Sequence, residues 1–273
     1  MGQKPGGRGR DSNRGGPVDV CVPELPATLR QIRDQKNLSR ATAYKCSGVA
    51  PSYIYQIESG LRQPSLTKLD CLINAYELDE DQARYVRDLR SPPVDLEPEE
   101  ELRRRVTSDA GFSAHLQDMQ NRGMPGAYMT PLFNVLMCND LLRSVLPGID
   151  EAGSILVWQF SPVAKELQVY WEREAVRAVA TAKGVLARHR HAEHAQRLLR
   201  KMSCNNDFRR IWESNIDVSY GRDSTDLKYF RVRGSDEIVG YSLTLSAVPE
   251  TSDLVLLNVV RKQSERRPGS LAE

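Results

Sequence analysis

Between residues 26 and 90 the sequence carries five short helical patterns, each bounded by residues that cap or end helices. Ser39 and Ser65 are typical N-caps, whereas Gly48 and Gly60 supply the backbone freedom found where a helix stops. Helices of this length are marginal alone and must bury their apolar faces against one another. The segment therefore predicts one small all-helical domain. We expect helices over residues 29–37, 40–46, 50–59, 66–76 and 79–90.

The second and third helices meet through Gly48, which provides the positive φ that a tight turn between helices requires. This is the arrangement of a helix-turn-helix, whose second helix enters the major groove of DNA. We expect the two helices to lock against the first one, with Glu58 paired to Arg33. The apolar residues expected in this contact are Ala43, Val49, Ile54, Ile57, Leu29 and Leu38.

The charge of this segment favours a nucleic-acid partner. Residues 28–68 hold seven basic and two acidic side chains, although the whole chain has a net charge of only +2. Cationic side chains of this kind contact phosphate and set the register on DNA, while the helix in the groove reads base edges. The alternative interpretation is an αα-hairpin from an ordinary helical bundle.

The motifs "LS", "GV", "IxxIExG" and "PS" follow one another at spacings that resemble the lambda-repressor/Cro-like DNA-binding domains, the XRE family. The resemblance implies that Gln56 faces the groove, where its amide suits the N6 and N7 of adenine. Arg40 stands where the family commonly has glutamine and suits phosphate contact, and Arg62 resembles a loop residue that touches phosphate or the minor groove. The predicted DNA-binding residues are Arg40, Ala50, Pro51, Ser52, Tyr53, Tyr55, Gln56 and Arg62.

Pro51 opens the predicted recognition helix, where its fixed φ fits and its missing N–H is not needed. It offers no polar group to a base. Readout is therefore expected to depend on Ser52, Tyr55 and Gln56, and the operator half-site is expected to be short.

After residue 90 the sequence pattern is no longer that of short, closely spaced helices. The segment 91–107 has prolines and a run of acidic residues, which favours a polar linker over a core element. Helical patterns then occupy 162–187, 192–203 and 206–215, and strand patterns occupy 227–233, 238–248 and 254–260; the apolar stretch 126–139 also has β character. In the second strand Leu243, Leu245 and Ala247 alternate with polar residues, as in a half-buried strand.

The prediction is a mainly α, five-helix helix-turn-helix domain followed by an α+β domain with an antiparallel sheet and helices on one face. The expected parts are a disordered Gly/Arg-rich arm at 1–25, the helix-turn-helix domain at 26–90, the linker at 91–107, a sensor and dimerisation domain at 108–262 and a disordered tail at 263–273.

The second domain is similar to the MmyB-like regulators, in which an XRE domain precedes a PAS-like ligand-binding domain. The motifs that carry this are "PLFNVLMCNDLLRSVL", "YWEREAVRAVA" and "NDFRRIWESNIDV", although "VYWERE" replaces the usual "DW" and "YFRVRGSDEIVG" the usual His-Pro turn. The resemblance implies an apolar, acyl-like effector. Candidate ligand residues are Phe133, Val135, Met137, Trp158, Trp171, Trp212 and Tyr241, and each is also explained as plain core.

Other chemistry is not indicated by the sequence. His189, His191 and His194 lack further ligands at metal-binding spacing, so a solvated basic helix end is expected instead of a metal site. No phosphate loop, nucleophile elbow, membrane span or secretory signal is recognised, and no cofactor or catalytic residue is predicted. Five widely spaced cysteines favour reduced, mostly buried thiols in a cytoplasmic protein.

These features predict a cytoplasmic, nucleoid-associated homodimer that binds a double-stranded operator and responds to an apolar effector through its second domain. One alternative is a regulator whose second domain only docks a protein such as RNA polymerase. The other is an enzyme with a helix-turn-helix appendage.

Overall fold

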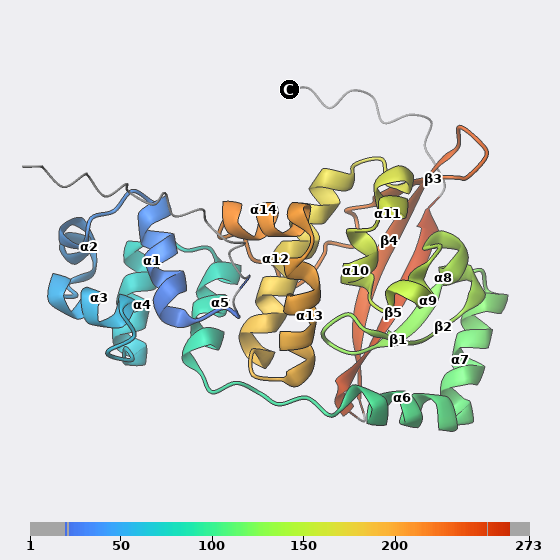
Figure 1. The fold of residues 1–273 in the computed structure, drawn as a ribbon, viewed down its shortest axis with the longest axis horizontal. Coiled ribbons are helices and arrows are strands. Elements are labelled where there is room, and N and C mark those ends of the chain that lie inside the picture. The colour runs from blue at the N-terminus through green and yellow to red at the C-terminus, as the bar shows by residue number, and fades with distance from the viewer. Residues whose placement is uncertain (1–19, 21, 250, 263–273) are drawn as a thin grey trace, which may run out of the picture.

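The computed structural model describes residue 20 and residues 22–249 and 251–262. The helices α1 to α5 gather at one end of the molecule, and the sheet with its covering helices forms the rest (Figure 1). The two parts confirm the predicted fold class. The expected tail at 263–273 and most of the expected arm lie outside the described residues.

The N-terminal part consists of five helices whose limits follow the predicted caps. Ser39 accepts a hydrogen bond from the backbone N–H of Thr42, and Ser65 accepts one from that of Lys68. Gly48 has φ +66°, which confirms its role in the turn. The helices are α1 (Leu25–Gln35), α2 (Arg40–Ser47), α3 (Pro51–Glu58), α4 (Leu66–Ala75) and α5 (Glu80–Arg90).

The end of the predicted arm is ordered instead of free. Helix α1 begins at Leu25, with Pro26 near its start, four residues before the predicted 29–37 helix. Val20 is buried against residues of the C-terminal part. An apolar residue beside a polar arm can be buried by tertiary contact, which the local composition did not reveal.

The α+β part contains a five-stranded antiparallel sheet with the order β2-β1-β5-β4-β3. The three C-terminal strand patterns and the β character of 126–139 are all confirmed. The strands are β1 (Gly126–Met129), β2 (Val135–Cys138), β3 (Lys228–Arg231), β4 (Ile238–Val248) and β5 (Thr251–Lys262).

Helices cover both faces of this sheet, so the expectation of helices on one face was wrong. One face packs on α8 to α11, and the opposite face, at β1 and β2, packs on α6 and α7. The helices are α6 (Glu99–Ser108), α7 (Ala110–Asn121), α8 (Asp140–Val145), α9 (Ile149–Ala152), α10 (Ile155–Gln159), α11 (Pro162–Leu167), α12 (Trp171–His189), α13 (Glu193–Ser203) and α14 (Asn206–Ser214).

Helix α6 also corrects the predicted linker at 91–107. Leu102 and Val106 are one helical turn apart and fully buried beside Tyr128 and Leu136. The acidic and basic residues around them occupy the solvent side of the same helix, so the segment is amphipathic despite its polar composition.

The predicted helix over 162–187 is divided in two. Gln168 forms an isolated bridge with Phe230, and the N–H of Val169 donates to the carbonyl of Tyr229. Pairing with the end strand therefore takes these residues out of the helical path.

Part of the predicted alternation in β4 is also wrong. Leu245 is 51% exposed, whereas Ser242 is buried and donates to the carbonyl of Ser224. Strand β3 pairs only with residues 238–241 of β4, so the later residues of β4 lie at an edge of the sheet.

The two parts share a continuous interface in which α5 packs on α12. Ala187 and Val218 belong to the same buried cluster as the N-terminal helices. The Tyr220 hydroxyl donates to Asp88, and the guanidinium of Arg84 lies 3.9 Å from the Tyr220 ring centroid. No helix among the described residues is long and apolar enough to span a membrane.

Candidate DNA-binding surface and sensor domain

Helix α3 presents one side to the core and the other to solvent. Ile54 and Ile57 are buried, whereas Tyr55 is 53% exposed. Ala50, Pro51 and Ser52 are exposed at the start of the helix, and Gln56 and Tyr53 are partly buried. Helices α2 and α3 lie at the end of the molecule farthest from the sheet, so the C-terminal part does not cover this surface (Figure 1).

Pro51 occupies the first turn of α3, as predicted, and Ala50 at the N-cap provides no side-chain hydrogen bond. The first helical turn has N–H groups with no partner inside the helix, so proline removes nothing that the helix uses.

A buried carboxylate joins the first three helices. The Glu58 side chain is 2% exposed and accepts hydrogen bonds from Arg33 Nε at 2.5 Å and Nη2 at 3.1 Å. Arg40 Nε donates to the same carboxylate at 2.9 Å, and Arg33 Nη1 donates to the carbonyl of Leu38. The hydrogen bonds to Glu58 raise the pKa of Arg33 above its ordinary value. The predicted Arg33–Glu58 pair is confirmed, and Arg40 is an additional member that sequence reasoning missed.

Two arginines lie over the tyrosines of the recognition helix. The guanidinium carbon of Arg40 is 5.3 Å from the Tyr55 ring centroid, and that of Arg62 is 5.1 Å from the Tyr53 ring centroid. Cation–π contacts of this kind hold flexible arginines in place and leave their edge N–H groups able to donate. The structure thus brings six of the predicted DNA-binding residues to one surface, with Arg40 and Arg62 beside them.

The predicted ligand residues do not form one group. Val135 and Trp158 belong to the core between the sheet and its covering helices, and the partly buried Phe133, Trp171 and Tyr241 pack against it. Met137 packs in the cluster on the opposite face of the sheet. Trp212 lies on α14, where it stacks on Phe208 with ring centroids 5.4 Å apart.

Both indole N–H groups in the main cluster already have acceptors. Trp158 donates to the carbonyl of Pro147 and Trp171 to that of Gln159, each at 2.8 Å. These bonds fix the rings as parts of the packed interior.

A chain of buried polar groups crosses this core, and the sequence analysis did not identify it. Lys228 Nζ donates to Gln159 Oε1 at 2.7 Å, and the Gln159 amide exchanges hydrogen bonds with that of Gln168. Burial lowers the pKa of Lys228 to about 8. The sequence around Lys228 shows only the alternation of a strand, so it did not indicate that this lysine is buried and bonded to a residue of a distant helix.

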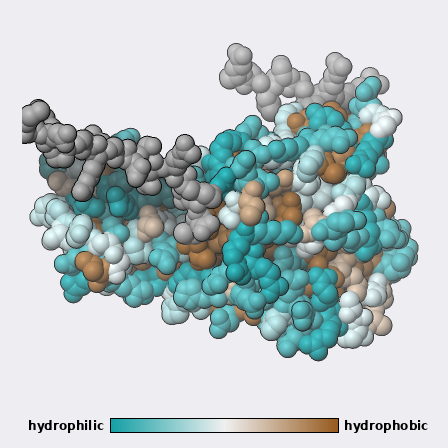
Figure 2. Space-filling view, viewed as in Figure 1, coloured by the Kyte–Doolittle hydropathy of each residue, from teal (hydrophilic) through white to brown (hydrophobic). Residues whose placement is uncertain are grey.

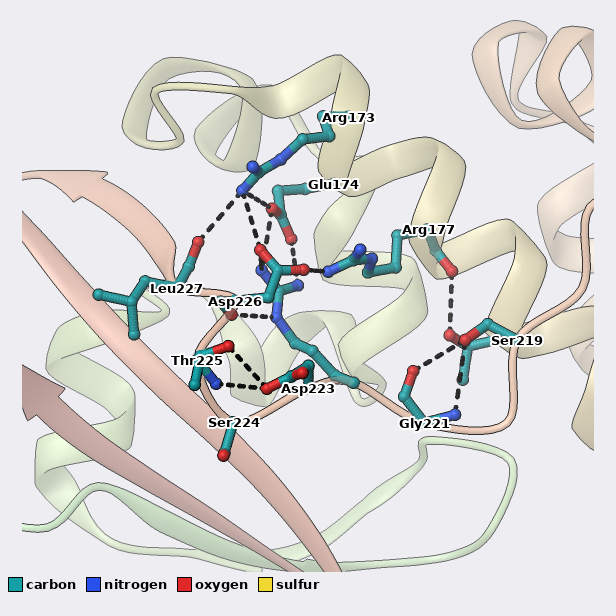
Figure 3. Close-up of polar contacts among 12 residues, drawn as sticks. Arg173, Glu174, Arg177, Ser219, Gly221, Asp223, Ser224, Thr225, Asp226 and Leu227 are labelled. Atoms are coloured by element: carbon teal, nitrogen blue, oxygen red, sulfur yellow. Dashed lines mark hydrogen bonds and ion pairs between the residues drawn. The ribbon is translucent and has the colours of Figure 1, made fainter. Parts of the chain in front are cut away.

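Glu174 on α12 anchors the loop that precedes β3 (Figure 3). It accepts hydrogen bonds from both Nη atoms of Arg222, at 2.6 and 3.1 Å, while Arg177 and Arg173 form ion pairs with Asp226. Burial pushes the pKa of Glu174 upward, but the Arg222 hydrogen bonds and the charge of Lys228 outweigh it, so the net pKa is lowered. The network fixes residues 219–227 against α12.

Of the three histidines in the predicted solvated helix end, His191 is exposed as predicted, and the other two are not. His189 and His194 are buried, and His189 Nδ1 lies 2.9 Å from the carbonyl of Val94. Burial lowers the pKa of His189, because the segment after α5 crosses over it.

Comparison with known families assigns both parts of the chain. Residues 24–86 match the model of a helix-turn-helix domain, and residues 112–267 match that of the MmyB-like transcription regulator ligand binding domain. No curated protein matches the chain significantly. The helix-turn-helix assignment supersedes the alternative of an ordinary αα-hairpin. Because the second match covers more than half of the 273 residues, the chain belongs to the MmyB-like transcription regulators and joins a DNA-binding helix-turn-helix to their ligand-binding domain.

Proposed function

We propose that this DNA-binding regulator recognises an inverted-repeat operator as a homodimer. The observation that carries the proposal is the open outer side of α3, on which Ser52, Tyr55 and Gln56 are accessible. One helix of eight residues reads few base pairs, and a second copy doubles the site with a fixed half-site spacing.

Within this surface, Gln56 reads an adenine through its amide, and Ser52 and Tyr55 contact neighbouring bases or phosphate. Arg62 binds phosphate beside the groove. Arg40 has a divided role, since its Nε is held by Glu58 while 36% of its side chain is exposed. Its remaining N–H groups bind a phosphate at the edge of the groove.

The direct test is a set of binding isotherms on a mapped operator. Gln56→Ala is expected to weaken binding by about 1–3 kcal/mol and to relax the preference at one base pair per half-site. Arg62→Ala is expected to weaken all sequences alike and to lower the salt dependence by about one counterion. Gln117→Ala, an exposed glutamine on α7, is the control. Equal affinity of Gln56→Ala and the unaltered protein for every operator variant contradicts the assignment.

We also propose that the ligand-binding domain takes an apolar, acyl-like effector between the sheet and its covering helices. Support comes from the family and from the aliphatic and aromatic surroundings of Val135 and Tyr241, which match the lining of such sites. The test is thermal denaturation with dodecanoate, in the unaltered protein and in Val135→Trp. Stabilisation in the first and none in the second is the expected result. A melting temperature that dodecanoate leaves unchanged in both rejects the proposed effector class.

A further inference from the structure

A half-open cleft of about 320 Å³ lies between the two parts of the molecule. Its walls come from α1 and α5 on the DNA-binding side and from α12 and α14 on the sensor side, with Val20 and residues 22–24 along one edge. On the face shown in Figure 2, hydrophobic residues reach the surface at this junction, although hydrophilic ones predominate elsewhere. The cleft is thus separate from the core beneath the sheet.

Lys183 lies in the wall formed by α12, and the residue is only 5% exposed. Its Nζ donates to the carbonyl of Asn215 at 2.6 Å and lies 5.4 Å from the Trp212 ring centroid. Among the described residues no carboxylate forms an ion pair with it. An ammonium has three N–H donors, so this cation has donor capacity left for a ligand.

The other walls are suited to an apolar body. Ile32, Trp212 and Ile216 provide hydrocarbon surface from both sides of the cleft, and Gln31 and Gln82 supply neutral amides. The two carboxylates that border the cleft, Glu24 and Glu213, are exposed on its rim, where water and salt screen their charge. The buried charge of the site is therefore positive.

We propose that this cleft binds a small organic anion with an apolar body, whose anionic group accepts hydrogen bonds from Lys183 and whose body lies between α1 and α14. The volume is at the lower end of the range for small-molecule sites, about 300–1,000 Å³. The site is additional to the effector position beneath the sheet, and its existence does not depend on that proposal.

The position of the cleft gives its ligand a regulatory consequence. Because both parts contribute walls, a bound molecule makes its full set of contacts only when α1 and α14 are held in this arrangement. The ligand therefore favours the docked arrangement over any in which the DNA-binding part separates, to the extent of its difference in affinity for the two. This step rests on the proposed function, whereas binding itself does not.

The binding test uses a matched pair of fluorescent probes and the full chain. 8-Anilinonaphthalene-1-sulfonate carries an anionic group on an apolar body, and N-phenyl-1-naphthylamine is the same body without the sulfonate. Lys183→Met is expected to raise the Kd of the sulfonate about tenfold or more and to leave that of the neutral probe within about twofold. Lys165→Met is the control, because Lys165 also lies over a tryptophan, with Nζ 4.6 Å from the Trp171 centroid, but outside the cleft.

A second variant changes the opposite wall of the cleft, which belongs to the DNA-binding part. Gln31→Trp on α1 adds bulk to the cleft and is expected to raise the Kd of both probes. A probe site confined to the sensor part would not respond to this substitution. Circular dichroism verifies that each variant is folded. Unchanged sulfonate affinity in both folded variants overturns the proposal. Operator binding by the ligand-free protein is measured separately, so failure of the cleft and failure of DNA recognition give different results.

The coupling is tested by limited proteolysis in residues 91–98, which join the two parts. The sulfonate is expected to slow cleavage there in the unaltered protein and not in Lys183→Met. Equal slowing in both proteins refutes the link between the cleft and docking.

Discussion

Replacement of Glu58 by glutamine tests whether one buried carboxylate holds together the first three helices, α1 to α3, of the DNA-binding part. The substitution keeps the shape of the side chain but removes the charge that Arg33 and Arg40 share. Glu58 is 2% exposed and Arg33 is 8% exposed, so the substitution leaves the buried Arg33 charge with a single ionic partner, the largely solvated Asp34 carboxylate 2.7 Å from its Nη1. Loss of one partner from a buried ion pair destabilises a protein by about 3–5 kcal/mol.

The two arginines are expected to differ in their contributions. Arg33 is bidentate and buried, so Arg33→Ala is expected to match the loss in Glu58→Gln. Arg40 is 36% exposed and its charge remains partly solvated, so Arg40→Ala is expected to reduce stability by only about 1 kcal/mol. The double replacement Arg33→Met with Glu58→Leu is expected to recover most of the loss, because no unpaired charge is then buried between them.

Urea denaturation followed by two spectroscopic probes measures these changes in the free energy of unfolding. Far-UV circular dichroism reports both parts, whereas tryptophan emission reports the α+β part, which contains Trp158, Trp171 and Trp212. Glu58→Gln is expected to move an early circular dichroism transition to lower urea while most of the emission change stays in place. A loss below about 1 kcal/mol in Glu58→Gln, or an equal loss in Arg40→Ala and Arg33→Ala, refutes the reasoning.

Three further predictions concern the α+β part. A Cβ on Gly184 would lie 2.9 Å from the Ser219 carbonyl, so Gly184→Ala is expected to destabilise by about 1–3 kcal/mol in thermal denaturation, whereas Gly221→Ala has open space and is expected to be neutral. Burial lowers the pKa of Lys228 to about 8, below the unfolded value of about 10.4. The folded state therefore binds fewer protons between these values, and stability relative to Lys228→Met is expected to rise across that window; a flat difference contradicts this. The pKa of His189 is also lowered, so stability relative to His189→Gln is expected to fall as pH drops below about 6.5 in urea titrations, and an unchanged difference contradicts it.

The DNA-binding part was predictable because its signals are local. Ser39, Gly48 and Ser65 act on their own helices, and helical spacing alone brings Ile54 and Ile57 to one side. Gly48 adopts the positive φ that the turn requires, and the cap hydrogen bonds form where the serines indicated them. The capping residues and the helical spacing of apolar residues were therefore sufficient to predict the helix-turn-helix.

The features that were missed depend on contacts between distant segments. Leu102 and Val106 stand in a run of charged residues, and their burial follows only from the sheet face to which α6 is bound. Glu174 and Arg222 are 48 residues apart, and Lys228 reaches Gln159 across 69 residues. Composition indicated a solvated surface at such positions, because an isolated charge is more often exposed than paired in a core.

The interface between the two parts sets what any effector can do to DNA recognition. The docked arrangement leaves α3 open, so this state does not block DNA by covering the recognition helix (Figure 1). The Asp88–Tyr220 hydrogen bond and the pairing of Val94 with Arg188 instead fix the direction in which the DNA-binding part projects. In a dimer joined through the α+β parts, that direction determines the spacing of the two recognition helices. For the proposed dimer, we therefore expect a ligand that favours docking to select one half-site spacing, and a ligand that favours separation to leave the spacing of the two recognition helices variable.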